Sequence, residues 1–274
     1  ALVTRAGGED VPLYRLTPIT VGAASARGYA ASRTATATRT DTPLRDTPQS
    51  VSVVTRDLIA DQAMQGMADV VRYMPGIQMG QGEGHRDAPT IRGQASTADF
   101  FLDGVRDDAQ YLRDLYNVER VEALKGPNAM IFGRGGGGGV INRVTKEAVW
   151  ARRRALVLSG GSFGHKRATL DLVQGFGAAL AARVNAVYEE SGGFRDAAEL
   201  RRYGLNPTVA LALGPRTTLR AGYERFSDRR RVDRGIPSYR GRPSDAEIAT
   251  FFGNPALNRA TLALDAATAS LEHA

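Results

Sequence analysis

The second half of the chain alternates apolar and polar residues, and this alternation limits the possible folds more than any other feature. Between residues 180 and 189 the even positions carry Leu, Ala, Val, Ala and Tyr, whereas Arg183, Asn185 and Glu189 occupy odd positions. A period of two is that of a β-strand with two different faces. The same alternation recurs at 155–159, 167–172, 209–213 and 219–224.

The connections between these segments are of two kinds. Some are short and contain glycine, such as GFG at 175–177 and GPR at 214–216, whereas those at 191–201 and 226–243 are much longer. Strands of about ten residues joined by alternating short and long loops are typical of an outer-membrane β-barrel, with apolar side chains toward lipid and polar ones toward the lumen. A soluble antiparallel sandwich also alternates. The pattern by itself leaves both architectures open.

Charge divides the chain into two parts with different surface chemistry. Residues 1–150 hold 17 Lys and Arg against 17 Asp and Glu, whereas residues 151–274 hold 19 against 12 and account for the whole net charge of +7. This asymmetry indicates two domains. The basic residues are spread over alternating segments and one loop, not along a helix or among stacking aromatics, so we expect no nucleic-acid partner.

The residue inventory argues against enzymatic chemistry. The chain has no Cys and only three widely spaced His residues, which excludes thiolate nucleophiles and thiolate metal sites. We find no nucleophile–base pair and no metal-ligand cluster, and therefore expect neither an enzyme nor a metal site. No run of about 18 apolar residues predicts a transmembrane helix. Residues 1–20 lack the features of a signal peptide, so we expect a chain that is mature or truncated at its front.

The first half predicts a small mixed α/β domain that ends near residue 148. Residues 22–50 are rich in Ala, Thr, Ser and Arg without periodicity, a composition that predicts a flexible segment. A strand at 51–54 is followed by one helix, capped by Thr55 and ending at Met74 before Pro-Gly. Further expected elements are strands at 90–92, 118–124 and 140–145, a loop at 80–87, and a hairpin at 100–106 with an Asp-Gly turn.

Five consecutive glycines, Gly135–Gly139, stand between two apolar segments. Part of this region satisfies G-x-G-x-x-G, but it leads into the strand pattern VINRVT instead of a helix, and no acidic residue follows at the required distance. A flexible linker would mix glycine with serine and other polar residues. We therefore expect the backbone to pack closely against neighbouring backbone here. On this view Gly137→Val should lower the folded yield of the domain.

Several stretches of the first half occur in a characteristic order. They are TPQSVSVVT at 47–55, DVVRYMPGI at 69–77, TIRG at 90–93, FFLDGVRD at 100–107 and RDLYNVERVEALKGPNAMIFGRGGGGGVINRVTK at 113–146. In sequence and spacing, over about 100 residues, they resemble the plug of TonB-dependent siderophore receptors. Residues 232–243, VDRGIPSYRGRP, and 251–253, FFG, resemble the early barrel of the ferric-catecholate branch.

The resemblance implies an α+β plug domain followed by the first antiparallel strands of a transmembrane β-barrel. We expect an N-terminal extension at 1–50, the plug at 51–148 and the first barrel strands at 149–274. A complete barrel in this family has about 22 strands, far more than the roughly 125 residues after position 148 can form. An incomplete barrel leaves unsatisfied backbone groups in lipid. We therefore expect the chain to be a fragment of a longer receptor that does not transport alone.

The resemblance also implies a mechanism and its partners. A ferric siderophore, which is the substrate and not a cofactor, binds at the outer apex of the plug in the outer membrane of a Gram-negative bacterium. A short segment ahead of the plug, the TonB box, then pairs as a strand with the periplasmic protein TonB, which acts with an inner-membrane complex. Our candidate for the box is Pro18, Ile19, Thr20, Val21, Gly22 and Ala23. The same residues could instead end a truncated upstream signalling domain.

Ligand contacts are expected on plug loops near 85–87, 94–97 and 106–113. Ferric catecholates are anionic, so Arg side chains and stacking or hydrogen-bonding Tyr residues suit them. The candidates are Arg92, Arg106, Gln110, Tyr111 and Arg113. For Arg92 the structural alternative is a salt bridge inside the plug, and for Arg113 a pair with Asp107, Asp108 or Asp114. The basic segment 228–242 is expected to face outward and to attract the chelate.

Two other functions fit the same residues. One is a transporter of the same class for haem, cobalamin or a glycan, against which the catecholate-like residues 232–243 argue. The other is a truncated binding or signalling module without transport.

Overall fold

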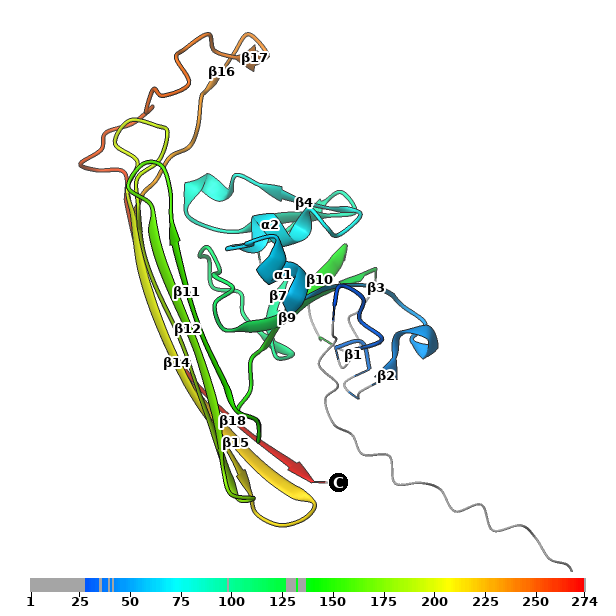
Figure 1. Ribbon diagram of the computed structural model, residues 1–274. Coiled ribbons are helices and arrows are strands. Elements are labelled where there is room, and N and C mark those ends of the chain that lie inside the picture. The colour runs from blue at the N-terminus through cyan, green and yellow to red at the C-terminus, as the bar shows by residue number, and fades with distance from the viewer. Residues whose placement is uncertain are drawn as a thin grey trace, which may run out of the picture.

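The computed structural model describes residues 28–34, 36–38, 40, 42–97, 99–126, 132 and 137–273. Figure 1 shows two parts: a compact unit of short helices and small sheets, and beside it a tall curved sheet of long strands. We call the first part, residues 50–145, the plug, and the second, residues 153–273, the wall. The wall stands along one side of the plug.

The plug is built on a mixed five-stranded sheet with the order β3-β9-β10-β7-β8. Strand β10 runs parallel to β7 and antiparallel to β9. Asp103 and Gly104 turn the β7–β8 hairpin with positive φ angles of 49° and 80°, as the Asp-Gly signal predicts. The strands are β3 Ser50–Thr55, β7 Phe100–Leu102, β8 Val105–Arg106, β9 Val118–Lys125 and β10 Gly139–Thr145.

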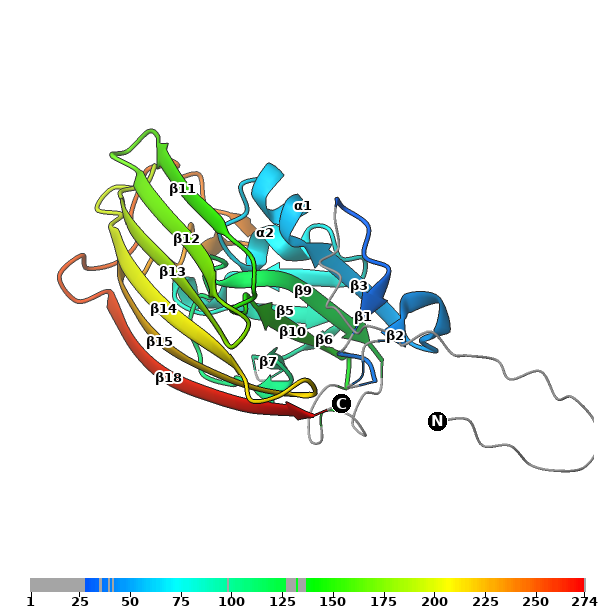
Figure 2. The same cartoon turned by 60° about the horizontal axis from the view of Figure 1, so that its bottom comes forward.

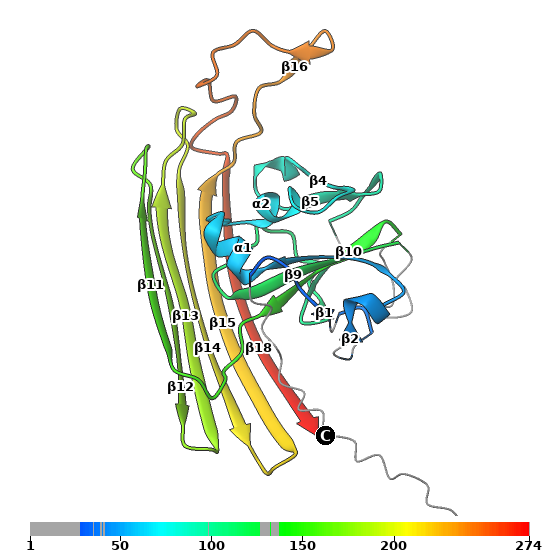
Figure 3. The same ribbon diagram turned by 45° about the vertical axis from the view of Figure 1, so that its right-hand side comes forward.

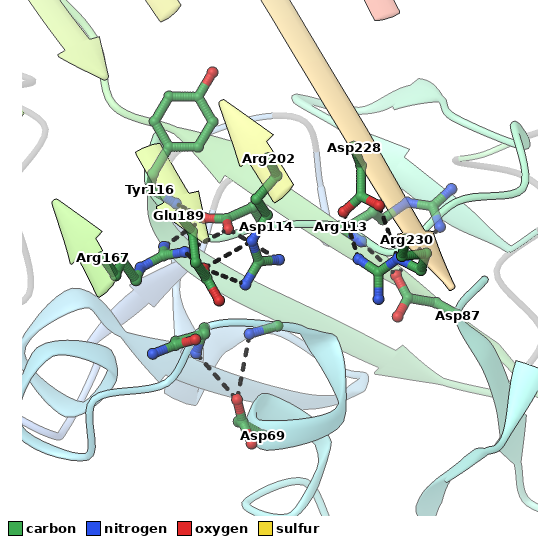
Figure 4. Close-up of polar contacts among 12 residues, drawn as sticks. Asp69, Asp87, Arg113, Asp114, Tyr116, Arg167, Glu189, Arg202, Asp228 and Arg230 are labelled. Carbon is green, nitrogen blue, oxygen red and sulfur yellow. Dashed lines mark hydrogen bonds and ion pairs between the residues drawn. The ribbon is translucent and has the colours of Figure 1, made fainter. Parts of the chain in front are cut away.

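The one helix expected after Thr55 is two short helices, α1 Arg56–Asp61 and α2 Met67–Val71. Thr55 does cap α1, because its side chain accepts a hydrogen bond from the first turn at 3.4 Å. The helix breaks where Ala63 adopts a positive φ of 49°. The carboxylate of Asp69 then accepts the Gly66 N–H at 3.3 Å and fixes the start of α2 (Figure 4).

Both helices keep the apolar face that the sequence predicts. Their buried residues join the five-stranded sheet in one core, whose members include Ile59, Met64, Met67, Val70, Val71, Met74, Phe100, Val121 and Ile141. Burial of a Leu, Ile, Met or Phe side chain contributes about 1.5–3 kcal/mol. The plug therefore has a hydrophobic core of its own.

Part of the segment expected to be flexible, residues 22–50, packs on the plug. The Thr34 hydroxyl donates to the buried carboxylate of Glu122, and the Thr36 hydroxyl accepts a 2.9 Å hydrogen bond from the Asn142 amide. Strands β1 Arg33–Thr34 and β2 Thr42–Pro43 pair with each other. Polar composition was misleading here because the plug sheet offers buried polar partners to the threonines.

A second, three-stranded sheet lies against the glycine-rich region. An added Cβ at Gly138 would overlap the carbonyl oxygen of Ile91, and one at Gly139, where φ is 146°, would overlap that of Leu124. Close backbone packing is therefore confirmed at these two glycines. Gly137 has open space at its Cβ position, so placing the expected clash there was wrong. The sheet consists of β4 Ile77–Gly80, β5 Ala88–Ile91 and β6 Gln94–Ala95.

The wall is a six-stranded antiparallel sheet in which the strands follow one another in chain order. Figure 2 shows it curving around the plug. Its last five strands have 11–15 residues, and about 9–11 suffice to cross a membrane. The strands are β11 Arg153–Gly160, β12 Lys166–Phe176, β13 Leu180–Ser191, β14 Leu200–Ala212, β15 Thr217–Arg231 and β18 Arg259–His273.

Short and long connections lie at opposite ends of the wall. At one end residues 177–179 and 213–216 make tight turns, and at the other residues 161–165, 192–199 and 232–258 make connections of increasing length. The longest loop carries the small strands β16 Ser238–Tyr239 and β17 Arg242–Pro243. Barrels of this type place short turns in the periplasm and long loops outside the cell. No helix in the described part of the chain is long and apolar enough to cross a membrane.

The alternation separates the two faces of the wall as the sequence predicts. On β13, Arg183, Asn185 and Glu189 are buried toward the plug. On the outer face Tyr188 is 45% exposed and Leu205 on β14 is 47% exposed. Apolar side chains thus cover the outside, and polar ones meet the plug.

Candidate functional site

Three plug loops meet at the end of the plug that lies under the long wall loops. Gln110 joins them, because its side-chain oxygen accepts a hydrogen bond from Arg86 and its amide donates to Thr97 at 3.4 Å. These contacts unite the loops at 85–87, 94–97 and 106–113, the three expected to form the apex. We call this loop cluster the apex.

The longest wall loop reaches down to the apex. In Figure 3 the segment that carries β16 rises above the plug. Its root touches the plug: Gln81 donates to the Asp233 carbonyl at 3.2 Å, and Arg234 pairs with Glu83. Gly84, with φ of 79°, approaches so closely that a Cβ there would overlap the Asp233 carbonyl. The outer loop and the plug tip therefore form one continuous surface.

Arg195, on the neighbouring outer loop, holds this long loop in place. It pairs with Asp233 at 2.6 Å and donates to the carbonyls of Ile248 and Thr250 at 2.7 and 3.3 Å. Sequence reasoning missed Arg195 and Arg86. A basic residue in an unassigned loop carries no periodic signal, so only proximity in the fold reveals them.

Two of the predicted ligand residues, Arg113 and Tyr111, are buried inside the plug. The Arg113 guanidinium is 3.9 Å from the Phe100 ring centroid and 4.4 Å from that of Tyr111, and it pairs with Asp107 at 2.9 Å. The Tyr111 hydroxyl donates to the same carboxylate at 3.0 Å. The geometry matches the structural alternative considered for Arg113, a pair with Asp107. Both side chains support the apex loop from below.

Asp107 is the centre of this internal network. Besides Arg113 it pairs with Arg143 at 2.6 Å, and Arg143 also donates to the Tyr111 hydroxyl at 3.0 Å. Burial would raise the pKa of Asp107, but the charges of Arg143 and Arg113 outweigh burial and hold that pKa below its usual value. The carboxylate therefore stays ionised and fixes the base of the 106–113 loop.

The remaining candidates occupy different positions. Gln110 is exposed at the apex, and Arg106 is partly exposed, with its guanidinium 5.5 Å from the Phe101 ring centroid and 3.9 Å from Asp108. Arg92 is exposed in the turn after β5. The TonB-box candidate, Pro18–Ala23, lies outside the described residues. The structure thus brings Gln110 and Arg106 to the same loop and places Arg92 on another.

The seam between plug and wall contains a buried cluster of four charges (Figure 4). The plug residue Asp114 accepts hydrogen bonds from Arg167 on β12 at 2.8 and 2.9 Å and lies 3.1 Å from Arg202 on β14. Glu189 on β13 pairs with both arginines, at 2.7 Å with Arg202. All four side chains are at least nine-tenths buried. We call this group the charge cluster.

The charge cluster lowers the pKa of Asp114. Burial would raise the pKa of this carboxyl, yet Arg202 and Arg167 outweigh burial and hold the pKa below its ordinary range. Two arginines balance two carboxylates, so the buried group is neutral as a whole. Such a cluster is sensitive to the loss of one member, because the others remain buried without their partner.

Two residues farther along the chain, Tyr116 inserts its ring into a notch of the wall. The notch is Gly204 on β14, where an added Cβ would lie 2.8 Å from the Tyr116 ring. Phe226 stacks on the ring with centroids 6.2 Å apart, and Val187 completes the apolar contact. A glycine inside a strand often marks such a close approach.

A second polar row also faces the plug: Asp171 lies four residues after Arg167 on β12, Arg183 lies six residues before Glu189 on β13, and Glu224 lies on β15. Glu224 accepts hydrogen bonds from the Tyr116 hydroxyl at 2.9 Å and the Asn117 amide at 3.0 Å. Asp171 pairs with Arg183 at 2.7 Å and with the plug residue Lys146 at 3.6 Å. Because residues an even number of positions apart share one face of a strand, both rows point to the plug.

No group of three or more His, Cys, Asp or Glu side chains in the described part of the chain is placed to hold a metal ion. The arrangement is that of a docking and binding surface: basic and amide groups at the apex, and an interlocked seam below it. Guanidinium and amide groups of this kind can donate hydrogen bonds to an anionic ligand.

Comparison with known proteins agrees with this architecture. Residues 43–140 match the model of the TonB-dependent Receptor Plug Domain. The chain is 34% identical to the probable TonB-dependent siderophore receptor PiuA of Acinetobacter baumannii over 77% of its length, covering 30% of that protein. It is 33% identical to the metal-pseudopaline receptor CntO of Pseudomonas aeruginosa over 84% of its length, covering 33% of that protein.

Two further comparisons give a similar degree of identity. The catecholate siderophore receptor Fiu of Escherichia coli is 32% identical over 72% of this chain, which covers 27% of Fiu. The crystal structure of PiuA superposes with a TM-score of 0.80 at 32% identity, over 84% of this chain and 35% of that one. The chain spans about a third of the length of the relatives it matches.

Proposed function

Because this chain belongs to the TonB-dependent receptor family, whose members are transporters and not enzymes, we propose that it forms the plug and first barrel strands of an outer-membrane receptor for ferric siderophores. One observation carries the proposal: the end of the plug where Gln110 joins three loops also contacts the root of the long outer wall loop, through Gln81 and Glu83. A chelate arriving from outside would meet this surface first.

The ligand site that we propose is the exposed part of the apex. Arg106 and Gln110 are its contacts on the plug, with Arg86 beside Gln110 and Arg234 on the outer loop. Guanidinium groups attract and bind the oxygens of an anionic chelate. Arg92 would contact the chelate from the turn after β5. Arg113 and Tyr111 would act by holding the 106–113 loop in shape, since both are buried.

The energy for release would come through the N-terminal segment. Residues 18–23, the TonB-box candidate, precede the segment whose Thr34 and Thr36 bind the plug sheet. Pairing of the box with TonB would apply force to this attachment. Deletion of residues 18–23 in the complete receptor should abolish energised uptake and leave chelate binding intact. Retained uptake would refute the assignment of the box.

The decisive experiment is uptake of a panel of radiolabelled ferric chelates by iron-limited cells that express the complete receptor gene. We expect uptake of one or more ferric catecholates, and loss of binding when Arg106→Ala and Gln110→Ala are combined. Val105→Ala is the matched control, because this apolar side chain directly precedes Arg106 and is 71% exposed. Normal binding by the double variant would reject the apex as the site.

A second cargo class has one observation in its favour. CntO, a metal-pseudopaline receptor, is 33% identical to the chain, close to the 34% of PiuA. The panel therefore includes a metal complex of pseudopaline. Uptake of that complex without uptake of any catecholate would assign the receptor to the second class.

A further inference from the structure

Three residues ahead of the plug cover part of one face of its five-stranded sheet. They are Thr34, Thr36 and Ala37, which we call the strap, and all three are buried. Figure 3 shows β1, which includes Thr34, beside the plug sheet. Thr34 binds Glu122 and Thr36 binds Asn142. Because Glu122 on β9 and Asn142 on β10 are register partners, the strap spans two neighbouring strands of the sheet.

Asn142 connects the strap to the β7–β8 hairpin. Its side-chain amide donates to the Thr36 hydroxyl at 2.9 Å, and its side-chain oxygen accepts the Gly104 N–H at 3.0 Å. Gly104 has a positive φ of 80° in the hairpin turn, so the second bond holds the turn itself. Asn142 is only 2% exposed. Loss of Thr36 would therefore leave its amide buried without that partner, which is costly enough to reorient the side chain.

A second contact leads from the strap to the same hairpin. Ala37 belongs to one apolar cluster with Phe101, Leu124 and Val140. Phe101 on β7 is the register partner of Arg106 on β8, and the Arg106 guanidinium lies 5.5 Å from the Phe101 ring centroid. A guanidinium within about 6 Å of a ring face is attracted to it. The strap thus packs against the cluster that contains the ring under Arg106.

The other half of the strap has no such link to the hairpin. Thr34 binds Glu122, which also binds Arg120 of its own strand β9. In the sheet order, β10 separates β9 from β7. The strap therefore offers two similar hydrogen bonds, one next to the hairpin and one a strand farther away, and these two bonds can be removed separately.

We propose that Thr36 and Asn142 are positioning residues for chelate binding, because the seated strap holds the β7–β8 hairpin in the shape that presents Arg106 to the chelate. This role rests on the proposed function and adds regulation of its site. When the N-terminal segment is pulled away, Asn142 loses Thr36, the hairpin turn loosens and affinity for the chelate falls. Coupling between two sites is reciprocal, so a bound chelate in turn stabilises the seated strap.

The test measures chelate binding to the complete receptor in isolated outer membranes, where no energy is supplied. The probe is radiolabelled ferric tris-catecholate, or the metal complex of pseudopaline if the wild type binds only that. Thr36→Val removes the hydroxyl at nearly constant shape and should raise the Kd about fivefold or more. Thr36→Ser keeps the hydroxyl and should stay within about twofold of wild type. Thr34→Val, the matched control, removes the bond to Glu122 and should also stay within about twofold.

A double variant shows whether the effect passes through Arg106. When Arg106→Ala is already present, Thr36→Val should change the Kd by less than about twofold, because the side chain that it positions is gone. Equal effects in the two backgrounds would overturn the positioning role, and so would an unchanged Kd for Thr36→Val alone. A wild-type receptor that binds neither probe would instead refute the proposed function, and the positioning role with it.

A labelling experiment does not require the Thr36 variants to assemble. Ala37→Cys places a thiol at a fully buried position of the strap, and this chain has no Cys of its own. A maleimide reaches this thiol only when the strap lifts, so saturating chelate should slow labelling about fivefold or more. Thr38→Cys is the control, because Thr38 is exposed and its labelling should not depend on the chelate. Labelling of Ala37→Cys at equal rates with and without chelate would overturn the coupling.

Discussion

Replacing Asp114 by Asn should weaken the attachment of the plug to the wall. The Asn side chain has the same shape, but Arg167 and Arg202 would then share Glu189 alone and leave one positive charge buried without compensation. Removing one partner of a buried ion pair typically costs 3–5 kcal/mol. At about 1.4 kcal/mol per tenfold, docking should weaken by roughly 100-fold to 3,000-fold.

The assay is urea-dependent protease access to the plug in the complete receptor. Asp108→Asn is the control: its carboxylate is 56% exposed and 3.9 Å from Arg106, so a change within about 1 kcal/mol is expected. Combining Asp114→Asn with Arg202→Gln removes the excess charge and should recover part of the loss. If Asp114→Asn alone stays within about 0.5 kcal/mol of wild type, the charge cluster does not anchor the plug.

Three further predictions use the same assay. Gly138→Ala should destabilise the plug by about 1–3 kcal/mol, because its Cβ would overlap the Ile91 carbonyl. Gly137→Ala, where the Cβ position is open, should keep the stability of the plug within about 0.5 kcal/mol of wild type. Equal effects of the two changes would contradict close packing at Gly138. Gly204→Ala should weaken docking of the plug by a similar amount, because the added Cβ would displace the Tyr116 ring. An unchanged urea midpoint would show that docking does not depend on the space at Gly204. Burial lowers the pKa of Lys146 to about 8 in the folded plug, whereas an unfolded lysine has a pKa of about 10.4. Above pH 8 the unfolded plug therefore binds more protons than the folded plug, so the free energy of unfolding should rise from pH 8 to about 10. Lys146→Met should abolish this rise.

Most of the architecture was accessible from the sequence. Alternation fixed the two faces of the wall, since Arg183, Asn185 and Glu189 could point only to the side opposite the apolar residues. Asp103-Gly104 identified the hairpin, and Thr55 the start of α1, because a positive φ and a helix cap are requirements of a few adjacent residues. The break after α1 and the attachment of Thr34 to Glu122 escaped prediction. Both depend on partners distant in the chain.

The candidate ligand site shows the same limit of prediction from sequence. Composition and motif similarity predicted ligand contacts on the 106–113 loop, but they could not distinguish exposed Gln110 from buried Arg113, because both are polar residues in one loop. Burial depends on what packs from elsewhere, here Phe100 and Asp107.

Local order along the chain thus determined the strands, the turns and the direction in which each wall side chain points. The tertiary structure alone decided which inward groups meet the plug: two arginines meet Asp114, and Gly204 makes room for the Tyr116 ring. The physical reason is that strand periodicity is set by neighbouring residues, whereas fit between two surfaces depends on atoms that are far apart in sequence.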